Sequence, residues 1–172
     1  MLRYLPPAVI ALALAGCATT TTRSGNLAIA ELADANGRPI GTAALSLRGN
    51  ETLINLSVSG TPGAVHGMHL HAVGKCEAPF TSAGPHLNPG GHQHGKDNPM
   101  GSHLGDLPNV TIGQNGVGTA SASLGTNDAA IDAALFDADG SAIVLHAAAD
   151  DYRTDPSGNS GARIACGVLT RS

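Results

Sequence analysis

The feature that most limits the fold of this chain is a series of short apolar runs separated by turn-forming residues. Runs of strand length cover residues 26–32, 39–47, 52–58, 110–112, 116–123, 131–136, 142–146 and 163–169. Turn sequences such as Asp34-Ala35-Asn36-Gly37 and Asp139-Gly140 separate them. Parallel strands need long crossovers, and no helix-period run of adequate length intervenes. The pattern therefore predicts an all-β chain of about eight or nine antiparallel strands, depending on whether residues 67–71 form one.

The composition limits the core and the kind of partner. Only four of the 172 residues are aromatic and none is Trp, so a core must consist of Ala, Val, Ile and Leu. The 23 glycines and 10 prolines lie between the apolar runs, which favours many turns over disorder. The net charge is −4 and no basic stripe is present, which excludes the electrostatic footprint of a nucleic-acid-binding protein.

The N-terminal segment has the pattern of an export signal. A short positive start is followed by an apolar run over residues 7–15, which is too short to cross a membrane as a helix. Residues 14–17 (LAGC) resemble a bacterial lipobox, in which Cys17 becomes the lipid-modified first residue. We therefore predict a signal peptide at 1–16, a lipidated Cys17 with a polar tether at 17–25, and one domain at 26–172. The alternative is an ordinary signal peptide that happens to contain Cys17.

The same segment bears on where the protein works. A lipid on Cys17 would make it a periplasmic protein anchored to the cell membrane, and Ala18 favours the outer membrane because it is not the aspartate that commonly retains lipoproteins at the inner one. Export into an oxidising compartment also concerns the other two cysteines, Cys76 and Cys166, which can form one disulfide. Two buried free thiols are the alternative, which export disfavours.

Histidines are the compositional outlier of the chain. Six of the eight lie within residues 66–94, in or beside a long loop at 72–108; a second long loop covers 147–162. Structureless loops of this length are usually functional. His69 and His71, at i and i+2, would share one face of a strand. Three nitrogens and a carboxylate from the following loop could close a tetrahedral zinc site: His86, His94, His103 and Asp106.

Four ordered motifs resemble the copper/zinc superoxide dismutase family. They cover residues 66–71 (HGMHLH), 81–89 (TSAGPHLNP), 103–109 (HLGDLPN) and 158–168 (GNSGARIACGV). The resemblance extends over residues 27–169 and implies an eight-stranded antiparallel Greek-key β-barrel or sandwich with two long functional loops, in agreement with the strand pattern. It also implies both cofactors, copper and zinc.

The resemblance implies a role for each matching residue. It assigns copper to His69, His71, His86 and His146, and zinc to His86, His94, His103 and Asp106. His86 would bridge the two metals, which requires loss of both ring protons. Asp150 matches an aspartate that hydrogen-bonds one histidine of each metal. Arg163 matches the arginine at the mouth of the copper channel, and Cys76 and Cys166 match the family's disulfide.

Other nearby residues have simpler interpretations. His66 matches a structural histidine, His92 has no counterpart and is expected on the surface, and Asp151 is expected in a solvated loop. The role of Lys75 is open. Met68 and Leu87 stand where aromatic residues are frequent in the family, which affects packing and leaves the metal assignments intact.

The implied activity is conversion of superoxide to oxygen and hydrogen peroxide by alternate reduction and oxidation of copper, with His86 and Arg163 as catalytic residues. Such an enzyme would protect the cell envelope from superoxide. The alternatives are a non-catalytic copper- or zinc-buffering lipoprotein and a superoxide-dismutase-like envelope protein. Both predict a missing copper ligand, bridge or arginine, and none is missing here. The pattern leaves a homodimer open.

Overall fold

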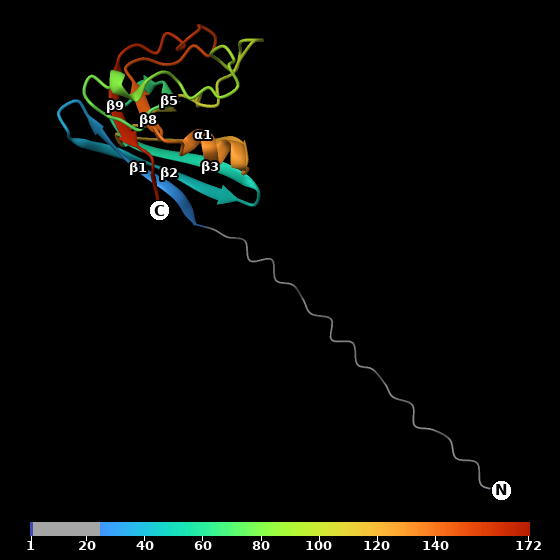
Figure 1. Ribbon diagram of the computed structural model, residues 1–172. Helices are drawn as coiled ribbons and strands as arrows, with labels where there is room; N and C mark the ends of the chain where they lie inside the picture. Colours follow the sequence, from blue (N-terminus) through green and yellow to red (C-terminus); the bar gives the residue numbers. More distant parts are fainter. Residues whose placement is uncertain (2–24) are drawn as a thin grey trace.

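The computed structural model describes Met1 and residues 25–172, and the fold is a curled antiparallel sheet with loops gathered at one end (Figure 1). Apart from Met1, the predicted signal peptide lies outside the described residues, as do Cys17 and nearly all of the predicted tether. The strands are β1 (Asn26–Asp34), β2 (Pro39–Arg48), β3 (Glu51–Ser59), β4 (Val65–His66), β5 (Met68–His71), β6 (Val110–Thr111), β7 (Val117–Thr126), β8 (Ala142–His146), β9 (Arg163–Val168) and β10 (Thr170–Arg171). A 3-10 turn, η1 (Thr81–Ala83), and one helix, α1 (Ala129–Leu135), complete the described elements.

The main sheet has the order β5-β8-β9-β1-β2-β3-β7, with β10 also paired to β1. Each of these pairings is antiparallel, and β4 pairs with β6 in a separate two-stranded sheet. Neighbours that are distant in sequence, such as β9 beside β1 and β3 beside β7, give the crossed connections of a Greek key. The predicted all-β antiparallel architecture is confirmed.

Small aliphatic side chains fill the inside of the curl, as the composition predicts. Along β3, the buried residues alternate with exposed ones and include Ile54, Leu56 and Val58. By contrast, all residues of β5 and β8 are buried. Met68 and Leu70 of β5 belong to the core, whereas the alternating His69 and His71 point to the other face, which the two long loops cover. The sheet therefore presents histidines to a buried space beneath the loops.

The strand predicted at 131–136 is wrong, because residues 129–135 form helix α1. The Asp128 carboxylate accepts hydrogen bonds from the backbone N–H groups of Ala130 and Ile131, and the helix itself is rich in alanine. Leu135 is buried in the core, and Ile131 packs against the same core, at the i, i+4 spacing of one helix face. Among the described residues, no helix is long and apolar enough to cross a membrane.

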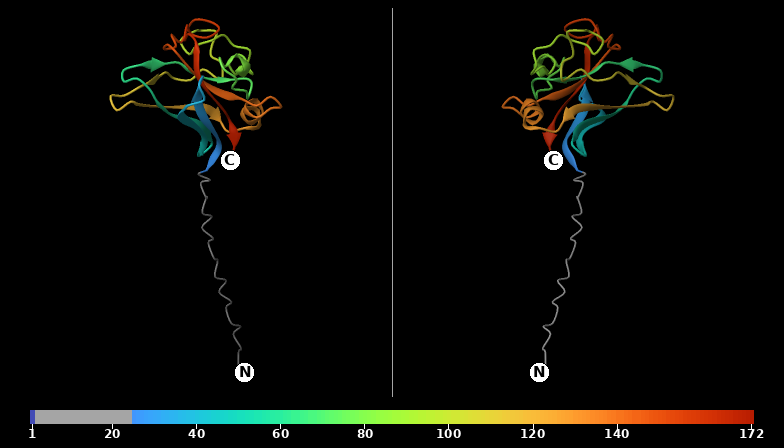
Figure 2. Two further views of the ribbon diagram at one scale, coloured as in Figure 1. Left: turned by 90° about the vertical axis from the view of Figure 1, so that its left-hand side faces the viewer. Right: turned by 90° about the vertical axis from the view of Figure 1, so that its right-hand side faces the viewer.

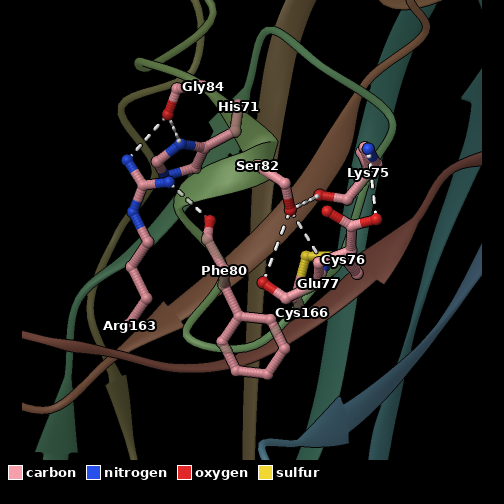
Figure 3. Close-up of a disulfide and its surroundings, with 9 residues drawn as sticks. All are labelled: His71, Lys75, Cys76, Glu77, Phe80, Ser82, Gly84, Arg163 and Cys166. Atoms are coloured by element: carbon pink, nitrogen blue, oxygen red, sulfur yellow. Dashed lines mark hydrogen bonds and ion pairs between the residues drawn. A yellow bond between two sulfur atoms is a disulfide. The ribbon is translucent and has the colours of Figure 1, made fainter.

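The disulfide between Cys76 and Cys166 is present and ties the loop at 72–108 to β9 (Figure 3). The two residues are 90 positions apart in sequence, and their Cα atoms lie 5.6 Å apart. Closing a loop of this length restricts the unfolded chain and contributes about 4 to 5 kcal/mol in the chain-entropy treatment. Both long loops lie at the same end of the molecule, over β5, β8 and β9, in all three views (Figures 1 and 2).

Candidate metal centre

Four histidines from three parts of the chain form a first cluster beneath the loops. His69 and His71 come from β5, His146 ends β8, and His86 follows η1 in the loop. One ligand nitrogen from each lies within 4.8 Å of the others, and all four side chains are buried. The register of β5 against β8 and a bridge between His71 and His86 bring the residues together.

The free nitrogens of this cluster point to a metal ion. Four of the buried nitrogens have no hydrogen-bond partner: His69 Nδ1, His71 Nε2, His86 Nε2 and His146 Nε2. Buried polar atoms normally have a hydrogen-bond partner. Four unpartnered nitrogens facing one another indicate a partner that accepts lone pairs, as a metal ion does. Burial lowers the pKa of His71 to about 2 and the pKa values of His86 and His146 to about 4. These three imidazoles are therefore neutral at neutral pH, the state in which imidazole binds a metal.

The opposite ring nitrogens fix the orientation of these imidazoles. His71 Nδ1 donates to the Gly84 carbonyl at 2.9 Å, and His146 Nδ1 donates to the Gly161 carbonyl at 3.2 Å. A carbonyl oxygen only accepts, so the proton sits on Nδ1 and the lone pair on Nε2 faces the cluster.

A second cluster surrounds one carboxylate oxygen. Asp106 Oδ1 lies 3.0 Å from His86 Nδ1, 2.9 Å from His94 Nδ1 and 3.1 Å from His103 Nδ1. The Nδ1 atoms of His86 and His103 are 3.4 Å apart. Ligands about 2.0 to 2.1 Å from a tetrahedral zinc ion would be separated by about 3.3 Å. The donor set and its spacing therefore fit zinc.

Two details support this second set. His94 Nδ1 is buried without a hydrogen-bond partner although it lies 2.9 Å from Asp106 Oδ1, because the contact lacks hydrogen-bond geometry. Burial acts to lower the pKa of His94, but the carboxylates of Asp106 and Asp150 outweigh it and raise the pKa to about 9. A zinc ion would displace that proton. His69 also comes within 4.8 Å of this set, but Asp150 binds its Nε2 and its free Nδ1 remains for the first cluster.

Backbone hydrogen bonds place the loop ligands against the sheet. Leu70 of β5 donates its N–H to the Gly105 carbonyl at 2.9 Å and accepts from the N–H of Leu87 at 2.8 Å. The free edge of β5 thus holds Leu87, which follows His86, and Gly105, which precedes Asp106. His86 belongs to both clusters, through Nε2 in the first and Nδ1 in the second.

Asp150 connects the two clusters from behind. Its Oδ2 accepts from His69 Nε2 at 2.6 Å, and its Oδ1 accepts from His94 Nε2 at 3.0 Å. Burial alone would raise the pKa of Asp150, but these hydrogen bonds hold it well below its ordinary value. Gly158 packs against this contact with a φ of +62°, and a Cβ there would overlap the Asp150 carboxylate and lie 2.6 Å from His94 Nε2. Each ring is thereby held from the side away from its cluster.

Arg163 is fixed beside the first cluster (Figure 3). Its guanidinium donates to the Phe80 carbonyl at 2.6 Å and to the Gly84 carbonyl at 2.7 Å, and the same Gly84 oxygen accepts from His71 Nδ1. The cation is therefore positioned relative to a cluster histidine. Lys75 lies next to Cys76, away from Arg163 in Figure 3. Its ammonium is exposed and 3.1 Å from the carboxylate of Glu77.

The remaining predicted residues lie outside both clusters. His66 Nδ1 donates to the carbonyl of His146 at 2.8 Å, a structural contact. His92 is exposed, and Asp151 is exposed and binds Thr154 and Asn159. The sequence patterns missed Asn109 and Tyr152, which contact Asp150 through their backbone or amide groups. Tyr152 uses its backbone N–H, which carries no residue signature. Asn109 uses its side-chain amide and ends the motif at 103–109, but nothing in the sequence pairs it with Asp150.

Comparison with known proteins agrees with the geometry. Residues 40–169 match the family described as copper/zinc superoxide dismutase (SODC). "Superoxide dismutase [Cu-Zn] 2" of Aquifex aeolicus is 40% identical over 147 residues, covering 81% of this chain and 84% of that protein. "Superoxide dismutase [Cu-Zn]" of Deinococcus radiodurans is 35% identical over 181 residues, covering 98% and 96%. The "Superoxide dismutase-like protein YojM" of Bacillus subtilis is 40% identical over 146 residues, covering 81% and 74%.

Solved structures show the same similarity. A crystal structure of a SOD-like protein from Bacillus subtilis has a TM-score of 0.77 and 36% identity, covering 85% of this chain and 100% of that one. The Cu/Zn superoxide dismutase from Brucella abortus has a TM-score of 0.64 and 26% identity, covering 83% and 98%.

The Gly158 contact gives a stability prediction. Gly158→Ala should lower the free energy of unfolding of the metal-free protein by about 1 to 2 kcal/mol from the positive φ. Displacing the buried Asp150–His94 hydrogen bond should cost about 1 to 3 kcal/mol more. Gly49→Ala is the matched control, because Gly49 has a φ of +63° and a Cβ added there would meet nothing within 4 Å. Chemical denaturation measures both; equal losses in the two variants would contradict this account.

Proposed function

The chain belongs to the copper/zinc superoxide dismutase family, and from this premise we propose that its two clusters hold copper and zinc for the dismutation of superoxide. In the overall reaction, two superoxide anions and two protons give one molecule of oxygen and one of hydrogen peroxide. The observation that carries the proposal is the set of four buried, unpartnered imidazole nitrogens, one of which belongs to a ring shared with a second, zinc-compatible set.

The donor atoms assign the two metals. Copper would be held by the unpartnered nitrogens of His69, His71, His86 and His146, since imidazole suits copper and no carboxylate completes this set. Zinc would be held by Asp106 Oδ1 and the Nδ1 atoms of His86, His94 and His103. When bound, copper would supply one-electron redox chemistry and zinc a fixed positive charge.

His86 is the residue at which this chain can hold a proton between the metals. Its imidazole presents Nε2 to the copper ligands and Nδ1 to the zinc ligands, so bridging requires that both ring protons be lost. Its Nε2 can then take up a proton and release it during turnover, while Nδ1 stays directed at the zinc set. One of the two protons needed for peroxide formation is thus placed within the copper-ligand cluster, and the other would come from solvent.

Arg163 supplies a fixed cation for an anionic substrate. Two carbonyl oxygens hold the guanidinium, and one of them also orients His71. A positive charge preorganised in this way attracts superoxide and aligns it beside the cluster without costly rearrangement. Lys75 has its charge offset by Glu77 and is exposed, so we assign it no comparable role.

The competing functions are metal buffering and a non-catalytic superoxide-dismutase-like role. The Bacillus subtilis relative carries the name "superoxide dismutase-like", so membership of the family does not by itself settle activity. In this chain, both ligand sets, the shared histidine and the arginine are all present and close together. That completeness favours the enzyme.

Loss of one copper ligand tests the activity. In metal-loaded protein, His146→Ala should lower the rate of superoxide consumption by at least about 100-fold, because loss of an outer-shell partner alone costs 10- to 100-fold. The zinc content should stay unchanged, since His146 is absent from the second cluster. His92→Ala, at an exposed histidine outside both clusters, is the control and should keep full activity. Equal rates in His146→Ala and wild type would rule out the proposed enzyme and leave metal buffering.

Arg163 gives a second prediction, read from salt dependence. Arg163→Ala should lower kcat/KM for superoxide about tenfold at low salt, the lower end of electrostatic steering effects, and the remaining rate should depend less on ionic strength. Lys75→Ala removes an exposed, paired cation and should change little. Stopped-flow measurement across a range of salt concentrations distinguishes the two. An unchanged salt dependence in Arg163→Ala would show that steering comes from elsewhere.

For the cellular setting, we propose that the protein is exported, anchored through a lipid on Cys17 at the periplasmic face of the outer membrane, and protects the envelope from superoxide. The support is the lipobox-like sequence at 14–17 and the neighbouring Ala18. Mass spectrometry of membrane-fraction protein should find a diacylglyceryl group on Cys17, and Cys17→Ser should shift the protein to the soluble fraction. A soluble, unmodified product that begins at another residue would contradict the anchor.

A further inference from the structure

Tyr152, in the loop at 147–162, hydrogen-bonds to three separate segments around the metal centre. Its backbone N–H donates to Asp150 Oδ1 at 2.6 Å, the oxygen that also binds His94. Its carbonyl accepts from the N–H of Asp97 at 3.0 Å. Its hydroxyl accepts from the N–H of Asn109 at 2.7 Å. One residue therefore joins the loop that carries Asp150 to the segments that follow His94 and Asp106.

Asn109 completes a closed hydrogen-bond network with Tyr152 and Asp150. Its Nδ2 donates to the backbone carbonyl of Asp150 at 2.9 Å, and its Oδ1 accepts from the backbone N–H of Asp150 at 2.8 Å. Asp150 is thus held at its main chain by Asn109 and at its carboxylate by Tyr152. The Tyr152 hydroxyl connects those two restraints, because it binds the Asn109 backbone.

The conformation of Tyr152 indicates that the surroundings determine its position. Its φ is +62°, a left-handed conformation that is rare for a residue with a bulky side chain and persists only where neighbours hold it. Gly95 packs so closely that a Cβ there would overlap the Tyr152 carbonyl. The Lys96 ammonium lies 4.2 Å from the centre of the ring, within the range of a cation–π contact.

We propose that Tyr152 is a positioning residue for both metal sites. Its hydroxyl stabilises the Asn109–Asp150 hydrogen-bond network and thereby the orientation of His69 and His94. The inference rests on the ligand assignment of the proposed function. Asp150 is the sole side chain bonded to the outer nitrogens of both His69 and His94 among the described residues. A loosened Asp150 would therefore misorient a copper ligand and a zinc ligand together.

Tyr152→Phe tests the hydroxyl while keeping the ring and its contact with Lys96. The full-length variant should bind zinc more weakly in competition with a chelator, by up to about 10-fold. This is the lower end of the cost of losing a direct outer-shell partner, because the hydroxyl acts through Asn109 and Asp150. Cobalt(II) bound in place of zinc should show an altered visible absorption spectrum, which reports ligand geometry directly. The thermal midpoint of the metal-free variant checks that it folds.

Thr154→Val is the matched control. It removes a hydroxyl hydrogen bond from the same loop, that of Thr154 Oγ1 to Asp151 Oδ2 at 2.6 Å, and this bond does not reach Asp150. Its zinc affinity and cobalt spectrum should equal those of wild type. An equal loss in Thr154→Val would show that general loosening of the loop is responsible, and wild-type affinity and spectrum in Tyr152→Phe would overturn the proposal outright.

A measurement on the wild type serves if Tyr152→Phe fails to fold. The backbone amides of Asn109 and Tyr152 are both donors in this hydrogen-bond network. They should exchange hydrogen more slowly with zinc bound than without it. Equal exchange rates would contradict the proposal. Failure of the ligand assignment looks different: wild-type protein would take up no zinc, or His94→Ala would bind zinc as the wild type does.

Discussion

The structure of the metal centre depends on one imidazole, that of His86, which belongs to both clusters. His86 can present Nε2 to the sheet histidines and Nδ1 to Asp106 only if the loop at 72–108 lies flat against β5. The free edge of β5 fixes the loop there through the backbone of Leu70, and the disulfide anchors the loop to β9. Strand pairing, docking of the loop and the disulfide together fix the position of the His86 imidazole.

Much of this could be predicted because the relevant rules are local. His69 and His71 share a face since side chains alternate along a strand, and β5 obeys that rule with its core-facing Met68 and Leu70. The small aliphatic residues of β3 alternate in the same way. The set His86, His94, His103 and Asp106 was predicted from its residue types and from the family resemblance. Nothing in the loop sequence fixes the path of the backbone that brings these residues together.

The failures have physical causes too. Residues 129–135 are too few to display a helical period, and the decisive feature is a cap: the Asp128 side chain replaces two missing backbone partners. Asn109 lies 41 positions from Asp150 and 43 from Tyr152, and the hydrogen bonds that join the three residues run partly through main-chain groups. A contact of that kind depends on where the backbone goes, which only the folded chain determines.

The charges of the site explain how an acidic protein can attract an anion. The chain carries a net charge of −4, and two of its carboxylates, those of Asp106 and Asp150, are buried at the metal centre. Two bound dications would exceed the combined negative charge of these carboxylates and a deprotonated His86. Arg163 then adds a cation on the side of the copper ligands, where the Gly84 carbonyl ties it to His71. With both metals bound, the local field would be positive where an anionic substrate arrives, because the fixed cations of the site would outweigh its carboxylates.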